Sequence, residues 1–377
     1  MIYILSFFLS CLLIKISYLV NKKVLKKVFI ILGFLVPCIL AGLRKETIGT
    51  DLQVYVKPMF QLAIEVKNFQ SFLSQEWVDK NTGAIWNIGR DVEIGFSLFL
   101  YYITKIFKNF QILLFLFQVI IVILIYKGLK LFKNKYLYLN MLIYYFLYYV
   151  VTFNIIRQYL AISIIFYGLK FLLKRKYKYY IVFNFLALFF HKSAIIGIII
   201  LILYEVSDNN RIKLFFLKFK IQNQVKIIIL ISILTLILFQ LEFIIRILQS
   251  IGLEKYKNYL KGEFYFLPKQ ILLRMPFIYL IFIEYKKNKK NRIYLFALLI
   301  NIIDLFLSQL GSITPNSWRI AQYFSIYNII FYPMVCDSGK YKIFKKLFLI
   351  SYLVFYFSYF ILILKNHEVY PYLFYWQ

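Results

Sequence analysis

The sequence predicts an all-α protein, a polytopic integral membrane bundle of helices. Of its 377 residues, 62% are hydrophobic and 21% are aromatic, whereas about half of an average soluble chain is apolar. The formal net charge is +30, but the lysines occur in short groups between apolar runs. That arrangement is typical of cytoplasmic loops of membrane proteins and not of nucleic-acid binding. The cysteines Cys11, Cys38 and Cys336 lie in apolar runs without metal-ligand spacing, so we expect them to be packing residues.

Each apolar run of sufficient length is interpreted as a membrane-spanning helix. The run 93–107 is the exception, because counting it as a crossing would reverse the charge pattern of every later loop; we expect it to be a short re-entrant or surface helix. The whole chain, 1–377, is therefore predicted to be a single transmembrane domain. Its twelve expected crossings are 2–20, 28–43, 110–126, 136–152, 155–173, 179–190, 193–206, 227–245, 271–285, 293–309, 319–335 and 347–364.

The basic residues distinguish the two sides of this bundle. Six loops on one side hold more than half of the 46 Lys and Arg residues, which predicts that this side is cytoplasmic and that both termini are extracytoplasmic. The six loops are 21–27, 127–135, 170–178, 207–226, 286–292 and 337–346. The opposite side carries both histidines, all four tryptophans and the segment 44–92. We expect 44–92 to be an extracytoplasmic loop that can serve as a lid.

The most informative stretch is 154–193, in which two apolar runs flank the basic turn 174–178. It predicts a helical hairpin with Arg157, Gln158 and His191 together at the end opposite that turn. Ionisable groups in membrane segments are costly and usually mark a functional site. The alternative is that Arg157 extends to a lipid headgroup and His191 caps a short helix.

Three acidic residues on the outer side are candidates for catalysis. In Gly49-Thr50-Asp51, Thr50 or Asp51 can cap the helix that follows, and this structural role alone would explain Asp51. Asp91-Val92-Glu93 is a weak indication of a metal site, and neither a metal nor another cofactor is expected. Glu93 suits the start of a helix because of the helix dipole, and it also suits a general base at the membrane boundary.

Arginine is used selectively on the outer side. A guanidinium binds phosphate oxygens through a rigid fork and stays charged when desolvated, whereas lysine acts as a point charge. Arg319 and Tyr323 are spaced to share one helix face, which would place an aromatic ring for sugar stacking beside a phosphate ligand. For Arg246 we expect pairing with an acidic residue or a membrane phosphate. The outer arginines are Arg44, Arg157, Arg246, Arg274 and Arg319.

The order of these motifs resembles the EpsG family of bacterial exopolysaccharide-assembly proteins, which are related in role to Wzy-type repeat-unit polymerases. The resemblance covers nearly the whole chain, and its most specific part is the central pair of motifs around Arg157 and His191. The matching elements are Arg44 with Gly49-Thr50-Asp51 and Tyr55, Glu93-Ile94-Gly95-Phe96, Asn154 with Arg157-Gln158-Tyr159-Leu160-Ala161, Phe190-His191-Lys192-Ser193-Ala194, Arg319 with Tyr323-Phe324, and Tyr370-Pro371-Tyr372.

The resemblance implies a multi-pass glycosyltransferase of the bacterial cytoplasmic (inner) membrane that uses oligosaccharides linked to undecaprenyl diphosphate. A growing glycan would leave its lipid diphosphate and join a sugar hydroxyl of an incoming repeat unit on the outer face, giving an exopolysaccharide, capsule or O-antigen chain. The expected general base is Glu93, His191 or Asp51. The expected diphosphate or substrate ligands are Arg44, Arg157, Gln158, Arg274, Arg319 and Tyr323.

Other functions fit the same helices. A flippase or transporter for lipid-linked oligosaccharides would also have a cationic cavity, although its polar groups should lie near the middle of the membrane. A membrane O-acyltransferase is a third option. The expected partners are the lipid-linked oligosaccharide, the bilayer and other polysaccharide-assembly proteins, with no nucleic acid.

Overall fold

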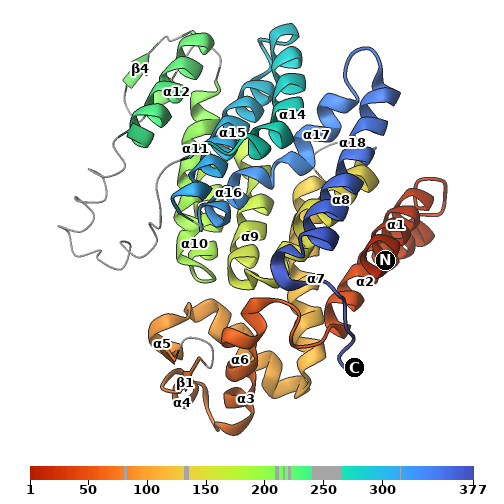
Figure 1. Cartoon of the computed structure of the whole chain (residues 1–377), viewed down its shortest axis with the longest axis vertical. Coiled ribbons are helices and arrows are strands. Elements are labelled where there is room, and N and C mark those ends of the chain that lie inside the picture. The colour runs from red at the N-terminus through yellow and green to blue at the C-terminus, as the bar shows by residue number, and fades with distance from the viewer. Residues whose placement is uncertain are drawn as a thin grey trace. The chain divides into compact units, whose positions relative to one another are not determined.

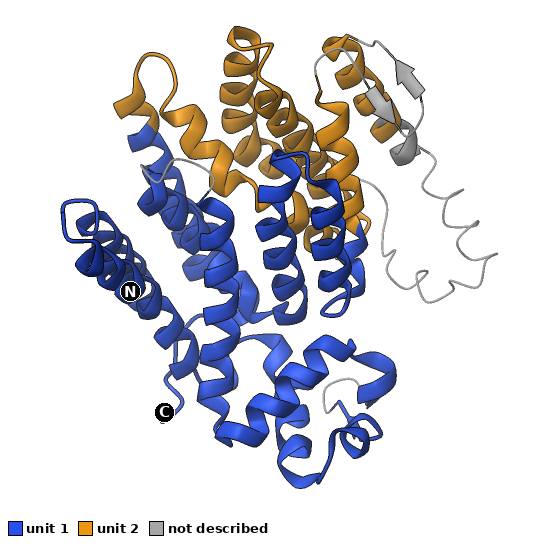
Figure 2. Cartoon of the chain, turned by 180° about the vertical axis from the view of Figure 1, so that it is seen from behind, with its two compact units in different colours: residues 1–195, 346–377 blue, residues 196–345 orange. Residues whose placement is uncertain are grey.

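The fold is known from a computed structural model that describes residues 1–79, 83–130, 136–208, 212–214, 217–219, 222–239, 265–314 and 316–377. Helices dominate these ranges, and their only strands form two short hairpins (Figure 1). The predicted all-α class is confirmed. The chain divides into two compact units, one of residues Met1–Ile195 with Lys346–Gln377 and one of residues Ile196–Lys345 (Figure 2). The single transmembrane domain remains a prediction.

Unit 1 contains the predicted central hairpin. Helices α9 and α10 pack side by side and are joined by the basic turn, as expected. The elements of unit 1 are α1 (Ile2–Ile16), α2 (Lys23–Leu43), η1 (Leu52–Val56), α3 (Lys57–Glu65), α4 (Phe69–Leu73), β1 (Glu76–Val78), β2 (Ile85–Asn87), α5 (Ile88–Asp91), α6 (Ile94–Phe107), α7 (Phe110–Leu129), α8 (Leu137–Tyr144), η3 (Tyr145–Tyr149), η4 (Val150–Phe153), α9 (Ile156–Leu173), α10 (Tyr177–Leu188), η5 (Lys192–Ile195), most of α18 (Lys342–Phe357), η8 (Ser358–Ile363) and η9 (Asn366–Glu368).

Helices α1 and α2 pack closely because of one proline. Pro37 has no backbone N–H, so the Gly33 carbonyl one turn earlier loses its helical partner. The Ser10 hydroxyl of α1 donates a hydrogen bond of 2.6 Å to that carbonyl. Gly33 also removes the side chain that would otherwise separate the helices, since an added Cβ would lie 2.9 Å from Ile14. Small and hydroxyl-bearing residues commonly mediate such contacts between apolar helices.

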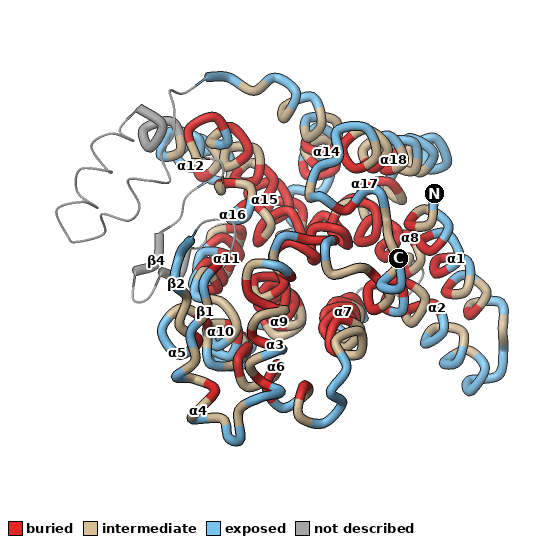
Figure 3. Tube along the Cα trace, turned by 60° about the horizontal axis from the view of Figure 1, so that its bottom comes forward, coloured by how far each residue is buried: buried red, intermediate tan, exposed pale blue. Residues whose placement is uncertain are grey.

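Helix α9 is the most buried of the long helices, and nearly its whole length is red in Figure 3. It packs against α7 and α10. The segment from η1 to α6 forms a layer across the end of the α9–α10 hairpin opposite the basic turn (Figure 1). This layer contains the region expected to act as a lid, and it contains α6, which is short as predicted.

Unit 2 is built around the helical hairpin of α14 and α15. Asn291 begins α15 by accepting a hydrogen bond of 3.1 Å from the Ile293 backbone N–H, as expected of a capping asparagine. The elements of unit 2 are α11 (Ile196–Val206), β3 (Ile212–Leu214), β4 (Leu217–Phe219), α12 (Asn223–Phe239), α14 (Pro268–Lys287), α15 (Arg292–Gln309), η7 (Leu310–Ser312), α16 (Ser317–Ser325) and α17 (Asn328–Cys336).

Several predicted crossings differ in their bounds. The run 319–335 is two helices, α16 and α17, and 136–152 passes from α-helix into π- and 3₁₀-turns. The run 2–20 stops being helical at Ile16, and residues 240–245 of the run 227–245 lie outside the described part. Apolar composition predicts a helix but does not reveal where it breaks. Within the described ranges, five helices are long and apolar enough to cross a membrane: Lys23–Leu43, Phe110–Leu129, Ile156–Leu173, Arg292–Ser312 and Lys342–Ile363.

The C-terminal tail, residues 365–377, is bound to the end of α2. Its backbone accepts a hydrogen bond of 2.9 Å from the Lys45 N–H at Leu373, and the Tyr375 N–H donates one of 2.9 Å to the Leu43 carbonyl. The Tyr372 hydroxyl donates to the Leu40 carbonyl at 2.7 Å. These contacts place the tail beside the end of α2, just before the segment that leads to η1.

Acidification should loosen this tail. Burial lowers the pKa of His367 from its ordinary 6.5 to about 4, so the folded tail disfavours the charged imidazole. A group with a depressed pKa stabilises the fold above pH 6.5, and this contribution is lost as the pH falls towards 4. A spin label at Gln377→Cys should therefore become more mobile over this window. In His367→Gln, which takes up no proton there, mobility should stay constant; a parallel change in both proteins would assign the effect to other groups.

Candidate functional site

Asp51 lies between α2 and η1, beside the first residue of α9. Its Oδ2 atom accepts a hydrogen bond of 2.8 Å from the Ile156 backbone N–H and another from the Tyr55 hydroxyl. Asp51 was expected to cap its own helix, but it makes no side-chain cap bond there. It serves instead the start of a helix 105 residues later, where free amides and the helix dipole favour a carboxylate.

Gly49 and Asn154 hold this turn in place. Gly49 has a φ of +97°, and an added Cβ would lie 2.6 Å from the Phe153 carbonyl oxygen, so only glycine fits. Asn154 Oδ1 accepts a hydrogen bond of 2.8 Å from the Thr50 N–H. Its Nδ2 donates at 2.6 Å to the His367 carbonyl. One amide side chain thus connects the turn, the start of α9 and the C-terminal tail.

Glu93 and Arg157 form the central ion pair of the site. Arg157 Nη1 lies 2.7 Å from Glu93 Oε2 and 3.3 Å from the Asp91 carbonyl oxygen. Glu93 Oε1 accepts a hydrogen bond of 3.1 Å from the Lys192 N–H. The Arg157 side chain is 15% exposed and the Glu93 side chain is 9% exposed. The pair is therefore largely desolvated but keeps some open surface. Charges in such surroundings interact more strongly than they do in water.

Gly95 brings Glu93 to the turn that contains His191. The Gly95 N–H donates a hydrogen bond of 2.8 Å to the Phe189 carbonyl at the end of α10. An added Cβ would lie 2.7 Å from the same carbonyl oxygen. The Glu-x-Gly-Phe motif therefore joins a carboxylate to the glycine that lets its helix approach α10.

Tyr55 supports the guanidinium of Arg157. The Arg157 Cζ atom lies 4.5 Å from the centroid of the Tyr55 ring, a cation–π distance. Burial, reinforced by the neighbouring Asp51 carboxylate, raises the pKa of Tyr55 well above its ordinary value of 10. Tyr55 therefore remains a neutral phenol that donates its hydrogen bond to Asp51.

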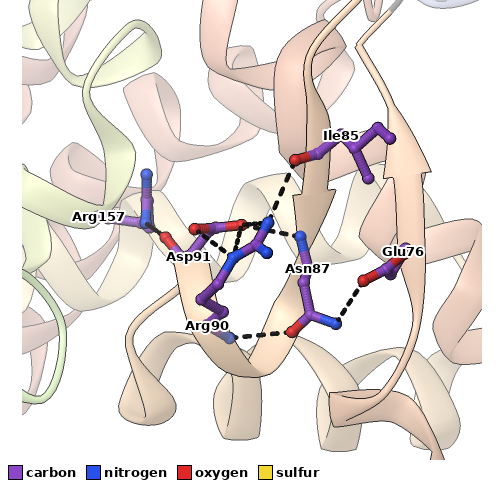
Figure 4. A network of polar contacts seen from close by, with 6 residues as sticks. All are labelled: Glu76, Ile85, Asn87, Arg90, Asp91 and Arg157. Carbon is purple, nitrogen blue, oxygen red and sulfur yellow. Dashed lines mark hydrogen bonds and ion pairs between the residues drawn. The ribbon is translucent and has the colours of Figure 1, made fainter. Parts of the chain in front are cut away.

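The side chain of Asp91 is paired with Arg90. Arg90 Nη2 lies 2.9 Å from Asp91 Oδ2, and its Nε lies 3.2 Å from Oδ1. Figure 4 shows this contact, with Arg157 reaching the Asp91 backbone from another direction. The hydrogen bond from Arg90 holds the pKa of Asp91 below its usual range. The described residues contain no group of three or more His, Cys, Asp and Glu side chains arranged to hold a metal.

His191 lies in the turn between α10 and η5. The Ser193 N–H lies 3.2 Å from His191 Nδ1, and the Ser193 hydroxyl oxygen lies 2.6 Å from the same atom. A backbone amide can only donate, so the contact with the Ser193 N–H favours the tautomer that carries its proton on Nε2. The Nδ1 atom of His191 is thus engaged by Ser193.

Two other predicted ligands are buried in unit 1. Arg44 is 2% exposed, donates at 2.6 Å to the Ala41 carbonyl and lies 4.0 Å from the centroid of the Phe153 ring. Burial lowers the pKa of Arg44 to about 10. Gln158 is buried in the first turn of α9. Both positions favour structural roles over the substrate contact that the sequence suggested.

The remaining predicted ligands belong to unit 2. Arg274 Nε lies 2.9 Å from Asp304 Oδ2, and its Nη1 lies 2.6 Å from Gln270 Oε1. The Arg274–Asp304 pair joins α14 to α15 and was not predicted. On α16, Arg319 is exposed and Tyr323 is buried, so the two do not share an exposed face as expected. Arg246 lies outside the described residues.

Three residues of the site were not among the predicted functional residues. Asn154 and Tyr55 are members of the motifs, but the motifs assign them no role. Lys192 contributes only its backbone N–H to Glu93, and no side-chain pattern can signal such a contact. The available signal for Asn154 was an amide side chain two residues before the start of an apolar helix.

These features define a helical membrane protein with a charged site at one end of an apolar helical hairpin. Glu93 and Arg157 form this site. The chain belongs to the EpsG family, whose family model matches residues 27–374. The resemblance expected from the motifs is thereby confirmed, and the protein is a multi-pass membrane protein of polysaccharide assembly. Comparisons with curated proteins and with solved structures gave no match.

Replacing Gly95 by alanine should disrupt the contact between α6 and α10. The added Cβ meets a backbone carbonyl at 2.7 Å, which cannot move aside easily, and overpacking of this kind costs about 1–3 kcal/mol. The midpoint temperature of unfolding of the detergent-solubilised protein should fall. Gly311→Ala is the matched control, since its Cβ would meet nothing closer than 3.6 Å. Equal midpoints for the two variants would contradict this account of Gly95.

Proposed function

We propose that this chain is a polysaccharide polymerase of the outer face of the bacterial cytoplasmic membrane, a glycosyltransferase whose donor is an oligosaccharide on undecaprenyl diphosphate. The observation that carries the proposal is the Glu93–Arg157 pair, 2.7 Å apart and mostly desolvated beside an apolar hairpin. It offers an acid–base group and a diphosphate ligand within one side-chain length of each other. An amphiphilic lipid-linked glycan requires both groups at a membrane boundary.

The proposed reaction divides the work between these two residues. Glu93 removes the proton from a sugar hydroxyl of the incoming repeat unit. The hydroxyl oxygen attacks the anomeric carbon of the growing glycan and forms the new glycosidic bond, while the bond from that carbon to the diphosphate breaks. Undecaprenyl diphosphate leaves with the electron pair, and the guanidinium of Arg157 stabilises its negative charge. Attack from the face opposite the leaving group inverts the anomeric configuration.

Glu93 is a better base than the other two candidates. Asp51 is engaged by the Ile156 amide and the Tyr55 hydroxyl, and removing it from these contacts would leave the start of α9 uncapped. His191 directs its basic nitrogen to Ser193. The partner of Glu93 is Arg157, and in this proposal the diphosphate competes with Glu93 for that guanidinium. Once the diphosphate binds the guanidinium of Arg157, Glu93 is released from the ion pair and can accept the proton of the sugar hydroxyl.

The rest of the proposal concerns topology and partners. We propose the twelve crossings expected from the sequence, with both termini outside and residues 44–92 acting as an outer lid. The substrate carries its own activation in the diphosphate bond, so the proposal includes no cofactor. Arg319, which is exposed on α16 of unit 2, is separately a candidate substrate ligand. Other polysaccharide-assembly proteins are the proposed protein partners, and the product is an exopolysaccharide, capsule or O-antigen chain.

A flippase for the same lipid is the second candidate. One observation favours it: Arg274 of α14 pairs at 2.9 Å with Asp304 of α15, a helix long and apolar enough to cross a membrane, and the Asp304 side chain is 3% exposed. The sequence suggested no charge pair of this kind. Charged pairs inside membrane helices are common in transporters, so this pair keeps the transporter function open.

Conservative replacements should separate charge from geometry in the Glu93–Arg157 pair. Arg157→Lys keeps the charge but loses the bidentate fork, so its polymer yield should fall nearly as far as that of Arg157→Ala. Losing one such contact to the leaving group costs roughly 3 kcal/mol, or about a hundredfold in rate. Glu93→Gln should fall comparably, because an amide cannot accept the proton. The measurement is polymer per cell at equal protein level.

The control for these variants is another ion pair in the same unit. Glu46 pairs with Lys57, but these side chains are 44% and 36% exposed, so Glu46→Gln should leave polymer yield unchanged. Normal polymer yield from Arg157→Lys would contradict the bidentate contact with the diphosphate. Arg157 would then only anchor its helix.

The location of accumulated repeat units should distinguish the two candidate functions. A polymerase acts after export, so its deletion should leave single repeat units on undecaprenyl diphosphate at the outer leaflet. These units should be cleaved by a glycosidase added to intact cells. Deletion of a flippase would leave the same lipid inside, protected until the cells are lysed. Protected units in a strain whose other flippases are intact would exclude the polymerase and support the transporter.

A further inference from the structure

Two arginines from different parts of unit 1 meet at Asp91. Arg157 of α9 donates a hydrogen bond of 3.3 Å from Nη1 to the Asp91 carbonyl oxygen. Arg90 lies on α5, at the end of the segment expected to act as a lid, and contacts the Asp91 carboxylate at 2.9 Å. Figure 4 shows the two side chains approaching Asp91 from different directions. Two guanidiniums are thus brought to a single residue.

Each of these guanidiniums is paired with a carboxylate of one short segment. Arg157 pairs with Glu93 at 2.7 Å. Arg90 pairs at 2.9 Å with Asp91, two residues before Glu93. A carboxylate and a phosphate group both present oxygens that suit the planar fork of arginine. The two carboxylates therefore occupy positions that the two phosphate groups of a diphosphate can take, whereas a monophosphate can replace only one of them.

The Arg90–Asp91 pair is open to an incoming ligand. The Arg90 side chain is 64% exposed and the Asp91 side chain is 31% exposed. Arg90 binds Asp91 through Nε and Nη2, and its Nη1 makes no hydrogen bond to the residues that the structure describes. Exposed ion pairs contribute little to stability. Asp91 can therefore release Arg90 to a stronger anionic partner.

The backbone around Arg90 is fixed, although its guanidinium is exposed. The Asn87 side chain accepts a hydrogen bond of 3.0 Å from the Arg90 N–H, and the Asn87 N–H donates one of 2.9 Å to Asp91 Oδ2. Arg90 Nη2 also lies 3.4 Å from the Ile85 carbonyl oxygen. These contacts hold Arg90 to the end of β2. A ligand group that is already positioned loses less entropy on binding.

The charged groups around Asp91 have a positive surplus. Arg90, Arg157 and Lys192 are cations, whereas Asp91 and Glu93 are acids. Lys192 is exposed, and its backbone N–H lies 3.1 Å from Glu93 Oε1. The hydrogen bond from Arg90 is the main cause that holds the pKa of Asp91 below its usual range, and the charge of Lys192 adds to it. Such a surplus attracts an anion.

We propose that Arg90 is a second ligand for the diphosphate of the lipid-linked oligosaccharide, which rests on the function proposed above. Arg157 binds one phosphate group and displaces Glu93, while Arg90 binds the other and displaces Asp91. Because Arg90 belongs to the segment 44–92 and Arg157 to α9, one diphosphate connects the expected lid to the helical hairpin. The two guanidiniums together select a diphosphate over a monophosphate.

The proposal predicts that Arg90 determines the preference for a diphosphate. The probes are farnesyl diphosphate and farnesyl monophosphate, titrated by calorimetry onto the full-length protein in nanodiscs of phosphatidylcholine, which has no net charge. Arg90→Gln should weaken diphosphate binding about tenfold but monophosphate binding less than about threefold, because one phosphate group still binds Arg157. Arg157→Gln should weaken the binding of both probes about tenfold.

Two further variants separate ligand binding from folding. Asp91→Asn removes the charge that competes for Arg90 but can still accept the hydrogen bond from the Asn87 N–H, so it should bind the diphosphate about threefold more tightly than wild type. If the Arg90–Asp91 pair were only structural, losing either partner would weaken binding alike. Lys67→Gln removes an exposed cation elsewhere in unit 1 and should leave both affinities unchanged.

Several outcomes would overturn the role of Arg90. They are unchanged diphosphate affinity in Arg90→Gln, an equal loss of affinity for the two probes, weaker diphosphate binding by Asp91→Asn, the same loss in Lys67→Gln, and no binding of farnesyl diphosphate by wild type.

The outcome is independent of the test of polymerase function. If deletion leaves repeat units protected inside intact cells but diphosphate binding depends on Arg90, the polymerase is excluded and the diphosphate site stands as part of a transporter. If deletion leaves exposed units but Arg90→Gln binds both probes normally, the polymerase stands and the role of Arg90 is wrong.

Discussion

The first turn of α9 begins inside unit 1, where its free amides must find acceptors other than water. The residue before it is Ile155, which has no capping side chain. In an apolar environment an unsatisfied amide costs several kcal/mol. Asp51 supplies the acceptor from a distant segment, and much of the surrounding arrangement follows from this requirement. The turn that carries Asp51 must approach Phe153 closely, so it needs Gly49, and Asn154 then fixes the turn from the other side.

This constraint separates the scaffold from the chemistry. Asp51, Tyr55 and Asn154 have their polar atoms bound to the protein itself, and Arg44 is buried beneath the tail. The Glu93–Arg157 pair is different because removing two charges from water is rarely repaid by their mutual attraction. A well-packed apolar pair in the same place would be as stable or more so. The pair is therefore weak evidence of stabilisation, and two charges beside an apolar hairpin mark a candidate functional site.

Some of this arrangement could be read from the sequence and some could not. The helical class, the hairpin of α9 and α10, and the meeting of Arg157 with the turn at His191 follow from hydrophobic runs and from where charges interrupt them. The partners of Asp51 and Arg274 could not be predicted, because apolar runs do not determine which helices pack together. For the same reason the burial of Tyr323 was missed. Helical spacing placed it with Arg319 on one helix, but spacing does not show which of the two residues neighbouring helices cover.

Tyr55 links the scaffold of the site to its ion pair. The ring is buried, and the Arg157 guanidinium lies 4.5 Å from its centroid. Its hydroxyl donates a hydrogen bond to Asp51, the residue that caps α9. The same ring stacks on Trp86 of the β1–β2 hairpin. The start of α9, the position of Arg157 and the attachment of the hairpin therefore depend on one side chain, which explains why the charged pair lies where these three elements meet.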